Sequence, residues 1–291
     1  MIPFFKMNGS GNDFVLIDNR EHVVETALGP VPVVDFVRSI CRRVASVGAD
    51  GLILIERSDR HAFRWRFFNA DGSEVEMCGN GGRCAARFAF LKKIAGRSMS
   101  FETAAGVIDA QVAKDVVKLR LTDPADLQLN VSLPVDGRTL ETHFVNTGVP
   151  HVVHFTEDLE TFDVFHTGRA IRYHEHYAPK GTNANFVRVI DGRTIQVRTY
   201  ERGVEDETLA CGTGSVASVL IAAARGMVES PVNVRVQSGE VLKVHYERDA
   251  KGFSRVYFEG RVQVTYEGTI WEEAYRSLAT QNAAAGLPFD N

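Results

Sequence analysis

Two stretches of the chain show the same order of hydrophobic and polar positions. "FRWRFF" (63–68) and "TIQVRTY" (194–200) alternate polar residues with aromatic or β-branched ones, which predicts a strand in each. An acidic loop follows each strand and ends in Cys-Gly-x-Gly, at Cys78 and at Cys211, directly ahead of a helical run. This repeated order predicts two similar lobes.

The pattern upstream of each lobe's thiol and within the helical runs indicates the fold class. Each half has an Asn-containing segment that leads into a hydrophobic strand, at 11–17 and at 181–190. The two helical runs lack a clean polar stripe, so we expect both helices to be buried. Other strands are short, numerous and separated by turns, which favours antiparallel sheet. We therefore predict an α+β fold with two pseudo-symmetric lobes, each a mainly antiparallel β-sheet or barrel wrapped round a central helix.

The turn-rich segment 121–130 marks the expected boundary between the lobes. We expect an N-terminal lobe at 1–122 and a C-terminal lobe at 123–256, each carrying one of the two Cys-Gly-x-Gly motifs. The C-terminal segment, at about 257–291, is expected to pack back on the first lobe.

The composition favours a small-molecule ligand. A formal net charge of -4 provides no broad basic field, so neither a nucleic acid nor an anionic membrane is an expected partner. The N-terminal sequence has no basic segment followed by an apolar run and a small-residue cleavage site. We therefore expect a cytoplasmic protein.

The cysteines and histidines do not indicate a metal site. The four cysteines are too few and too scattered for a disulfide scaffold or a zinc site. Cys41 and Cys84 are interpreted as small buried hydrophobic residues. The histidines at 151–154 and 174–176 are interpreted as solvated side chains, and no metal is expected.

The position of the other two thiols, Cys78 and Cys211, suggests chemistry. The first amides of a helix lack intrahelical partners, and with the helix dipole they favour anions such as a carboxylate or a thiolate. The glycines after each cysteine remove side chains that would keep a ligand away from these amides. Two such thiols on opposite faces of one carbon would supply a base and an acid, and this pair would invert a stereocentre.

Several long motifs then resemble the diaminopimelate epimerases over nearly the whole chain. In order, they are "FFKMNGSGNDFVLID" at the start, "NADGSEVEMCGNGGRCAARF", "NTGVPHVV", "GTNANFV" and "RTYERGVEDETLACGTGS". The resemblance implies a homodimeric isomerase that needs no cofactor and interconverts LL- and meso-diaminopimelate in lysine and peptidoglycan precursor biosynthesis. It also implies the two-lobed fold described above.

The resemblance also assigns roles to individual residues. It implies that Cys78 and Cys211 are the base and the acid, and that His151 and Glu201 support catalysis. It implies substrate binding by Asn12, Asn69, Gly79, Asn80, Asn183, Glu201, Arg202, Gly212 and Thr213.

The chain departs from the family pattern at Asn8 and Ser10, in the length of the loop before Cys211, and at two positions that concern expected substrate contacts. Val149 stands where Asn is common, which leaves Asn146 as a candidate for that contact, and Gly51 stands where Gln is frequent. Neither position affects the thiol pair.

Three alternatives remain open from the sequence. A proline or hydroxyproline racemase would keep the fold and the two cysteines, whereas an isomerase of the phenazine-biosynthesis type would lack the thiol pair. In a non-catalytic amino acid binding protein the thiols would be structural.

Overall fold

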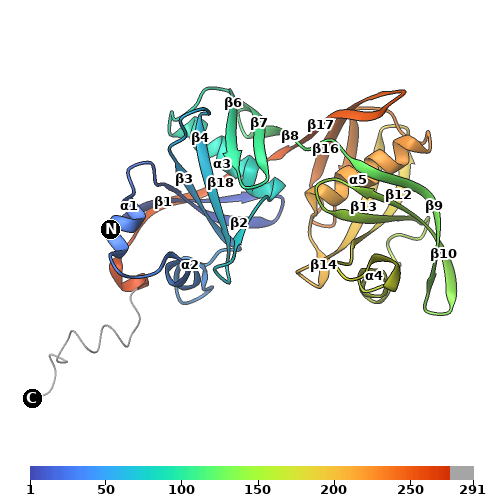
Figure 1. Ribbon diagram of the computed structural model, residues 1–291, viewed down its shortest axis with the longest axis horizontal. Helices are drawn as coiled ribbons and strands as arrows, with labels where there is room; N and C mark the ends of the chain where they lie inside the picture. The colour runs from blue at the N-terminus through green and yellow to red at the C-terminus, as the bar shows by residue number, and fades with distance from the viewer. Residues whose placement is uncertain (276–291) are drawn as a thin grey trace, which may run out of the picture. The chain divides into compact units, whose positions relative to one another are not determined.

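The computed structural model describes residues 1–275 and divides into two units (Figure 1). The first unit contains Met1–Asp115 and the chain from Val262 onward, and the second contains Val116–Arg261. The divisions therefore fall after 115 and 261, whereas the sequence prediction places them after 122 and 256. The reason is that β8 (Val116–Arg120) pairs along its whole length with β17 (Gly252–Arg261) in the second unit.

Two further predictions at the lobe boundaries can be compared with the structure. The predicted turn-rich boundary is largely strand, because β9 (Ala125–Val135) begins within it. Of the C-terminal segment, β18 (Gln263–Ile270) pairs with β1 (Ile2–Gly9) of the first unit and the 3-10 turn Glu272–Ala274 follows. Residues 276–291 of that segment lie outside the described residues.

The strands of the first unit form one hydrogen-bonded series. From β18 and β1 it continues through β2 (Asn12–Asp18), β3 (Gly51–Glu56), β4 (Phe63–Asn69), β6 (Ser98–Thr103) and β7 (Gly106–Ala113), with β5 (Glu74–Val75) also on β4. Only the β2/β3 and β4/β6 pairs in this series are parallel. The helices are α1 (Val23–Leu28) and α2 (Val33–Cys41) between β2 and β3, and α3 (Gly79–Leu91) between β5 and β6.

The second unit is built in the same way. Its series runs from β9 through β10 (Arg138–Asn146), β11 (Pro150–Phe155), β12 (Asn183–Asp191), β13 (Thr194–Glu201), β15 (Val232–Arg235) and β16 (Val241–Asp249) to β17 and β8, with β14 (Asp206–Thr208) on β13. The β11/β12 and β13/β15 pairs are parallel. The helices are α4 (Val164–Arg172) with the 3-10 turn Glu175–Tyr177 between β11 and β12, and α5 (Gly212–Ala224) between β14 and β15.

The two units repeat one order of elements down to the register of single residues. Strands β1 to β7 correspond in order to β10 to β16, and the two parallel pairs fall at the same places. Corresponding residues pair in the same way, as in Phe14–Gly51 and Ile53–Phe67 of the first unit and His151–Asn183 and Asn185–Thr199 of the second. The predicted α+β fold with mostly antiparallel sheet is confirmed.

The helices that follow the cysteines are the central elements of the two cores. Figure 1 shows α3 among the strands of the first unit and α5 among those of the second. Every residue from Gly214 to Ala223 of α5 is buried, and α3 is buried over most of its length. Each fully buried Val, Leu, Ile or Phe side chain contributes about 1.5–3 kcal/mol to stability. Phe88 of α3 and Val219, Leu220 and Ile221 of α5 therefore help to hold these helices in place.

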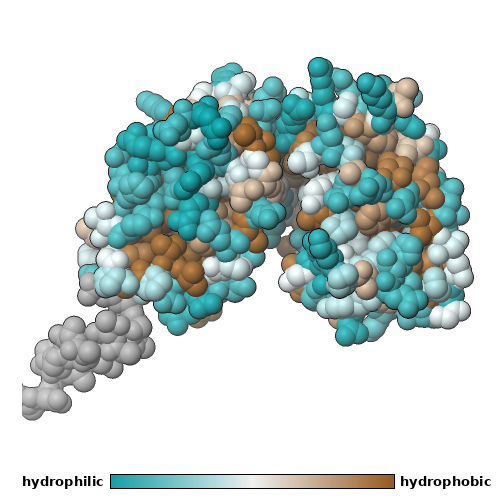
Figure 2. All heavy atoms as spheres, in the orientation of Figure 1, coloured by the Kyte–Doolittle hydropathy of each residue, from teal (hydrophilic) through white to brown (hydrophobic). Residues whose placement is uncertain are grey.

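The surface is mostly polar on the face that Figure 2 presents, with smaller apolar patches between the hydrophilic residues. Within residues 1–275, no helix combines the length and the apolar character needed to cross a membrane.

Candidate active site

Cys78 is the N-cap residue of α3. Its backbone is extended, at φ -144° and ψ 119°, and its Sγ accepts a hydrogen bond from the Gly81 amide at 3.5 Å. A Cβ on Gly81 would lie 3.2 Å from Ile53 Cδ1, so the first turn leaves little room for a side chain there. The sulfur is therefore held at the positive end of a 13-residue helix.

Cys211 has the same position on α5. Its φ is -114° and its ψ is 114°, and its Sγ accepts from the Gly214 amide at 3.4 Å. The Thr213 Oγ1 also lies 3.6 Å from the sulfur. Each unit thus places one thiol at a helix N-terminus, where amides and dipole favour an anion.

A buried network joins the start of α3 to β2. Asn80 donates from Nδ2 to Asn12 Oδ1 at 2.8 Å, and its own Oδ1 accepts from Arg83 Nη2 at 2.6 Å. The Arg83 Nη2 also donates to Ser10 Oγ at 2.6 Å. Asn12 in turn donates from Nδ2 to Asp50 Oδ2 at 3.1 Å. Two predicted substrate ligands, Asn12 and Asn80, are therefore in direct contact and fixed from both sides.

Asn69 is separate from this network in its hydrogen bonding. It is the last residue of β4, and its Nδ2 donates to Ser73 Oγ at 3.3 Å within the acidic loop. Gly51 pairs with it across β3 and β4. A Cβ at Gly51 would lie 2.4 Å from Phe68 O, so this backbone has no space for the Gln that the family pattern often has.

Glu201 lies beside Cys211 at the end of β13. Burial raises the pKa of its carboxyl above the ordinary 4.5, while hydrogen bonds from Thr208 and Cys211 partly oppose the shift. The Thr208 Oγ1 donates to Glu201 Oε2 at 3.0 Å. The structure thus pairs one predicted catalytic carboxyl with one predicted catalytic thiol.

The Asn183 side chain makes hydrogen bonds to the backbone at two other predicted site residues, at Arg202 itself and at Pro150, which precedes His151. Its Oδ1 accepts from the Arg202 amide at 2.8 Å, and its Nδ2 donates to Pro150 O at 2.9 Å. Asn146, the candidate replacement for the contact missing at Val149, uses its Oδ1 to accept from the Gly148 amide at 3.0 Å. The side-chain oxygen of Asn146 therefore closes its own turn.

His151 is the clearest correction to the sequence interpretation. The sequence pattern predicts a solvated ring, as for His154, but the His151 side chain is 0% exposed. Burial, with a smaller contribution from the Arg202 charge, lowers its pKa to about 3, so the ring is neutral at physiological pH. Its Nδ1 lies 3.1 Å from Asn185 Nδ2.

The other two cysteines fit the interpretation as buried hydrophobic residues. Cys41 is 4% exposed and Cys84 is fully buried, and burial raises the pKa of each thiol to about 12. Among residues 1–275, no group of three or more His, Cys, Asp or Glu side chains is arranged to hold a metal ion.

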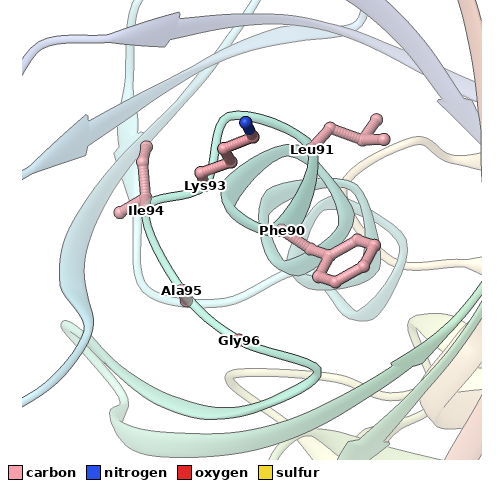
Figure 3. Close-up of a pocket in the computed structure, with 6 residues that line it drawn as sticks. All are labelled: Phe90, Leu91, Lys93, Ile94, Ala95 and Gly96. Atoms are coloured by element: carbon pink, nitrogen blue, oxygen red, sulfur yellow. The ribbon is translucent and has the colours of Figure 1, made fainter.

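A surface hollow of about 620 Å³ lies away from this chemistry. Its lining consists of Phe90, Leu91 and residues 93–96, and Figure 3 shows these residues at the last turn of α3 and in the loop that follows. That is the opposite end of α3 from Cys78, and the lining is mainly apolar. The hollow is therefore not part of the candidate site.

Three residues of the site were missed from the sequence. Arg83 and Asp50 hold the Asn12–Asn80 pair, and Asn185 contacts His151. Two signals were present. One is an arginine among the small residues at the start of a helix, and the other is a second asparagine two positions after Asn183, on the same face of a buried strand.

Solved structures share this fold at low sequence identity. A PhzF-family phenazine biosynthesis protein of Bacillus anthracis matches with a TM-score of 0.71 and 15% identity, over 93% of this chain and 99% of that chain. A probable proline racemase of Agrobacterium radiobacter K84 matches with a TM-score of 0.69 and 13% identity, over 96% and 95%. These similarities define the fold class.

Sequence comparison defines the family. The diaminopimelate epimerase family model matches residues 4–126 and 143–264. The diaminopimelate epimerase of Aquifex aeolicus (strain VF5) is 50% identical over 94% of this chain and 99% of its own length, and that of Archaeoglobus fulgidus is 43% identical over 88% and 95%. The chain belongs to the diaminopimelate epimerase family.

Proposed function

We propose that this chain interconverts LL- and meso-diaminopimelate by two-base proton transfer, with Cys78 and Cys211 as base and acid. Membership of the family supports the substrate, the isomerase reaction and a place in lysine and peptidoglycan precursor biosynthesis. The observation that supports the two-base chemistry is the matched pair of N-caps, with thiol-to-amide distances of 3.5 Å at α3 and 3.4 Å at α5.

The proposed step is balanced in protons and electrons. One cysteine, as thiolate, forms an S–H bond as the Cα–H bond breaks, and the electron pair stays on the α-carbon and spreads into the α-carboxylate. The other thiol gives its proton to the opposite face of the same carbon, so configuration inverts and the two sulfurs exchange protonation states. Helix-end amides, including those near Gly79 and Gly212, stabilise the developing charge.

We infer the supporting roles from the neighbours of each thiol. Glu201 accepts the proton of the adjacent Cys211, which generates the thiolate there. Arg202 binds the distal carboxylate of the substrate, since a guanidinium can donate two parallel hydrogen bonds to it. Substrate contacts are also proposed for Asn12, Asn69, Gly79, Asn80, Asn183, Glu201, Gly212 and Thr213.

Deuterium exchange tests this function against its rivals. The protein is incubated in deuterated water with LL-diaminopimelate, and in a parallel sample with L-proline. Uptake of deuterium at the α-carbon with formation of the meso isomer is expected for diaminopimelate only. Exchange with proline would support a racemase, and binding without exchange from either amino acid would support a non-catalytic binding protein.

Three accompanying properties are part of the proposal. The reaction needs no added cofactor, so activity should survive dialysis against a chelator and purified protein should lack a pyridoxal absorbance band. The chemistry requires reduced thiols, in agreement with the cytoplasmic location expected from the sequence. The expected homodimer can be measured by light scattering against the chain mass of 32.2 kDa.

A further inference from the structure

Three polar side chains lie together in the core of the second unit beneath the start of α5. They are His151 on β11, Asn185 on β12 and Thr199 on β13, and none is more than 3% exposed. The corresponding positions of the first unit, by strand register, are Phe14, Ile53 and Phe67. The same architecture is therefore built with apolar residues in one unit, so the fold alone does not require the polar trio.

The orientation of the Asn185 amide is fixed by the backbone carbonyl of Val152. A backbone carbonyl can only accept, and Val152 O lies 2.8 Å from Asn185 Nδ2, so the NH₂ group faces that side. The Oδ1 on the other side accepts from Thr199 Oγ1 at 2.9 Å. These two hydrogen bonds leave one N–H of the amide for His151.

This orientation determines the tautomer of His151. The remaining N–H of Asn185 donates to His151 Nδ1 at 3.1 Å, so Nδ1 carries a lone pair. In a neutral ring the proton must then be on Nε2. The Nε2 atom is buried and has no hydrogen-bond partner among the described residues. A buried N–H without a partner is costly, and a ligand or reacting group can satisfy it.

Asn185 also contacts the helix turn that carries the second thiol. A Cβ on Gly214 would lie 2.3 Å from Asn185 Oδ1, so the amide packs directly against this residue. The amide N–H of Gly214 is the group that donates to Cys211 Sγ. The same asparagine therefore lies against both His151 and the first turn of α5.

We propose that Asn185 is a positioning residue that fixes His151 as a neutral Nε2–H donor. This inference rests on the proposed epimerase function, and it specifies how His151 supports it. The ring donates a hydrogen bond to an anion formed in the reaction, a thiolate or the substrate carboxylate, and it does not accept a proton from a thiol. The low pKa set by burial agrees with this role, because the ring stays neutral throughout the range in which thiols react.

Nitrogen NMR of the histidine rings tests the tautomer directly. The full-length protein is labelled with ¹⁵N-histidine, and the His151 signals are assigned by their loss in His151→Gln. The expected result is a protonated Nε2 and an unprotonated Nδ1. A protonated Nδ1 in the wild-type protein would overturn the proposal.

Two variants separate the proposed role from a structural one. In Asn185→Asp the carboxylate can only accept, so the proton should move to Nδ1, and kcat should fall by roughly 100-fold or more with a smaller change in KM. Thr199→Val is the matched control, because it removes a hydrogen bond to Asn185 while the bonds to Val152 and His151 remain. It should keep the Nε2–H tautomer and most of kcat. An unchanged tautomer in Asn185→Asp, or an equal loss of kcat in both folded variants, would contradict the assignment.

The two proposals fail in distinguishable ways. The ring spectrum is recorded without substrate, so it reports the tautomer even if the wild-type protein shows no epimerisation. Absence of epimerisation would refute the proposed function. A wrong tautomer in an active enzyme would refute only the role of Asn185. Asn185→Leu gives a second check, because loss of the amide should produce a mixture of both tautomers, whereas a pure Nε2–H ring would show that Asn185 does not fix it.

Discussion

Asn80 Nδ2 donates to Asn12 Oδ1 at 2.8 Å and thereby ties the first turn of α3 to the start of β2. Asn80 is two residues after Cys78, and Asn12 is held from its other side by Asp50. This hydrogen bond therefore connects the helix that carries one proposed catalytic thiol to a proposed substrate ligand on a strand.

Replacement of Asn12 should affect both stability and activity. Asn12→Ala removes the acceptor for the buried Asn80 amide, and leaving such a group unsatisfied costs about 1–3 kcal/mol. Because Asn12 is also a proposed substrate ligand, KM for diaminopimelate should rise. Urea unfolding and steady-state kinetics measure the two effects.

Asn8→Ala is the control for this change. Asn8 lies in the same β1–β2 hairpin, but its Oδ1 accepts only an exposed turn hydrogen bond from the Gly11 amide, at 3.2 Å. It should keep near wild-type KM and stability. Equal effects in the two variants would show that the hairpin as a whole is sensitive and that Asn12 has no particular role.

Each thiol should transfer protons on only one face of the substrate α-carbon. In Cys78→Ser or Cys211→Ser a hydroxyl replaces a much stronger acid, so inversion should collapse in both. The remaining thiol can still exchange a proton on its own face, so each variant should retain slow α-deuterium uptake from one isomer. The preferred isomers, LL and meso, should be opposite. Full inversion by either variant, or the same preference in both, would refute the two-base assignment.

The hydrogen bond from Thr208 to Glu201 should influence the position of the acid limb in the pH profile of kcat/KM. Burial already raises the pKa of Glu201, and the bond from Thr208 lowers it by favouring the carboxylate. Thr208→Val should therefore raise the pKa further. If Cys211 is deprotonated by the Glu201 carboxylate, the acid limb of kcat/KM moves to higher pH.

Thr161→Val is the control for the loss of a threonine hydroxyl. Its Oγ1 makes an exposed 3.4 Å bond to Asp158 O, away from the site. The acid limb of the kcat/KM profile of Thr161→Val should coincide with that of the wild type. An unshifted acid limb in a folded Thr208→Val enzyme would count against the proposed role of Glu201.

Gly214 is expected to be intolerant of a methyl group. In most helices Gly→Ala stabilises by about 0.8–1.0 kcal/mol. At Gly214 the added Cβ would lie 2.3 Å from Asn185 Oδ1 and 3.2 Å from Cys211 Sγ, and Asn185 is held by its hydrogen bonds. Gly214→Ala should therefore lower both the melting temperature and kcat.

Gly192→Ala, in the β12–β13 turn of the same unit, supplies the comparison. No heavy atom outside its own neighbours lies within 4 Å of a Cβ there. Its melting temperature and kcat should remain close to the wild type. A melting temperature of Gly214→Ala above the wild-type value would show that the first turn of α5 can accommodate a Cβ, and it would contradict the expected clash with Asn185.

His151 should contribute to the loss of stability in acid. Its folded pKa of about 3 lies below the ordinary 6.5, so below pH 6.5 the unfolded chain binds the proton more readily than the folded one. The stabilising contribution is therefore complete above 6.5 and is lost as pH falls toward 3, at no more than roughly 1.4 kcal/mol per pH unit. In His151→Gln, the free energy of unfolding from urea titrations should decline less steeply over this range.

The exposed His22 provides the control for histidine removal. His22→Gln should follow the wild-type decline, because this side chain is 75% exposed. Burial lowers the pKa of His143 to about 4, so His143 also reduces stability in acid, but by the same amount in all three proteins. Parallel curves for the wild type and His151→Gln would contradict the buried neutral state of His151.

The amino-acid sequence by itself determined the two repeated strands, the repeat and the position of each thiol at a helix start. These are local properties: alternation along 63–68 and 194–200 specifies strands, and Cys-Gly-x-Gly ahead of an apolar run specifies a capped, buried helix. A strand or a helix start is set by neighbours within a few residues, and the sequence shows those neighbours directly.

The tertiary structure determined which side chains contact one another and which are buried from solvent. His151 lies 34 positions from Asn185 and Arg83 lies 73 positions from Ser10, yet both pairs are hydrogen-bonded in the core. The interpretation of His151 as solvated was wrong because burial depends on what the whole chain packs over a residue. The tautomer of His151 likewise depends on the Asn185 amide, whose orientation is set by the backbone carbonyl of Val152 on a neighbouring strand, and no local pattern encodes that arrangement.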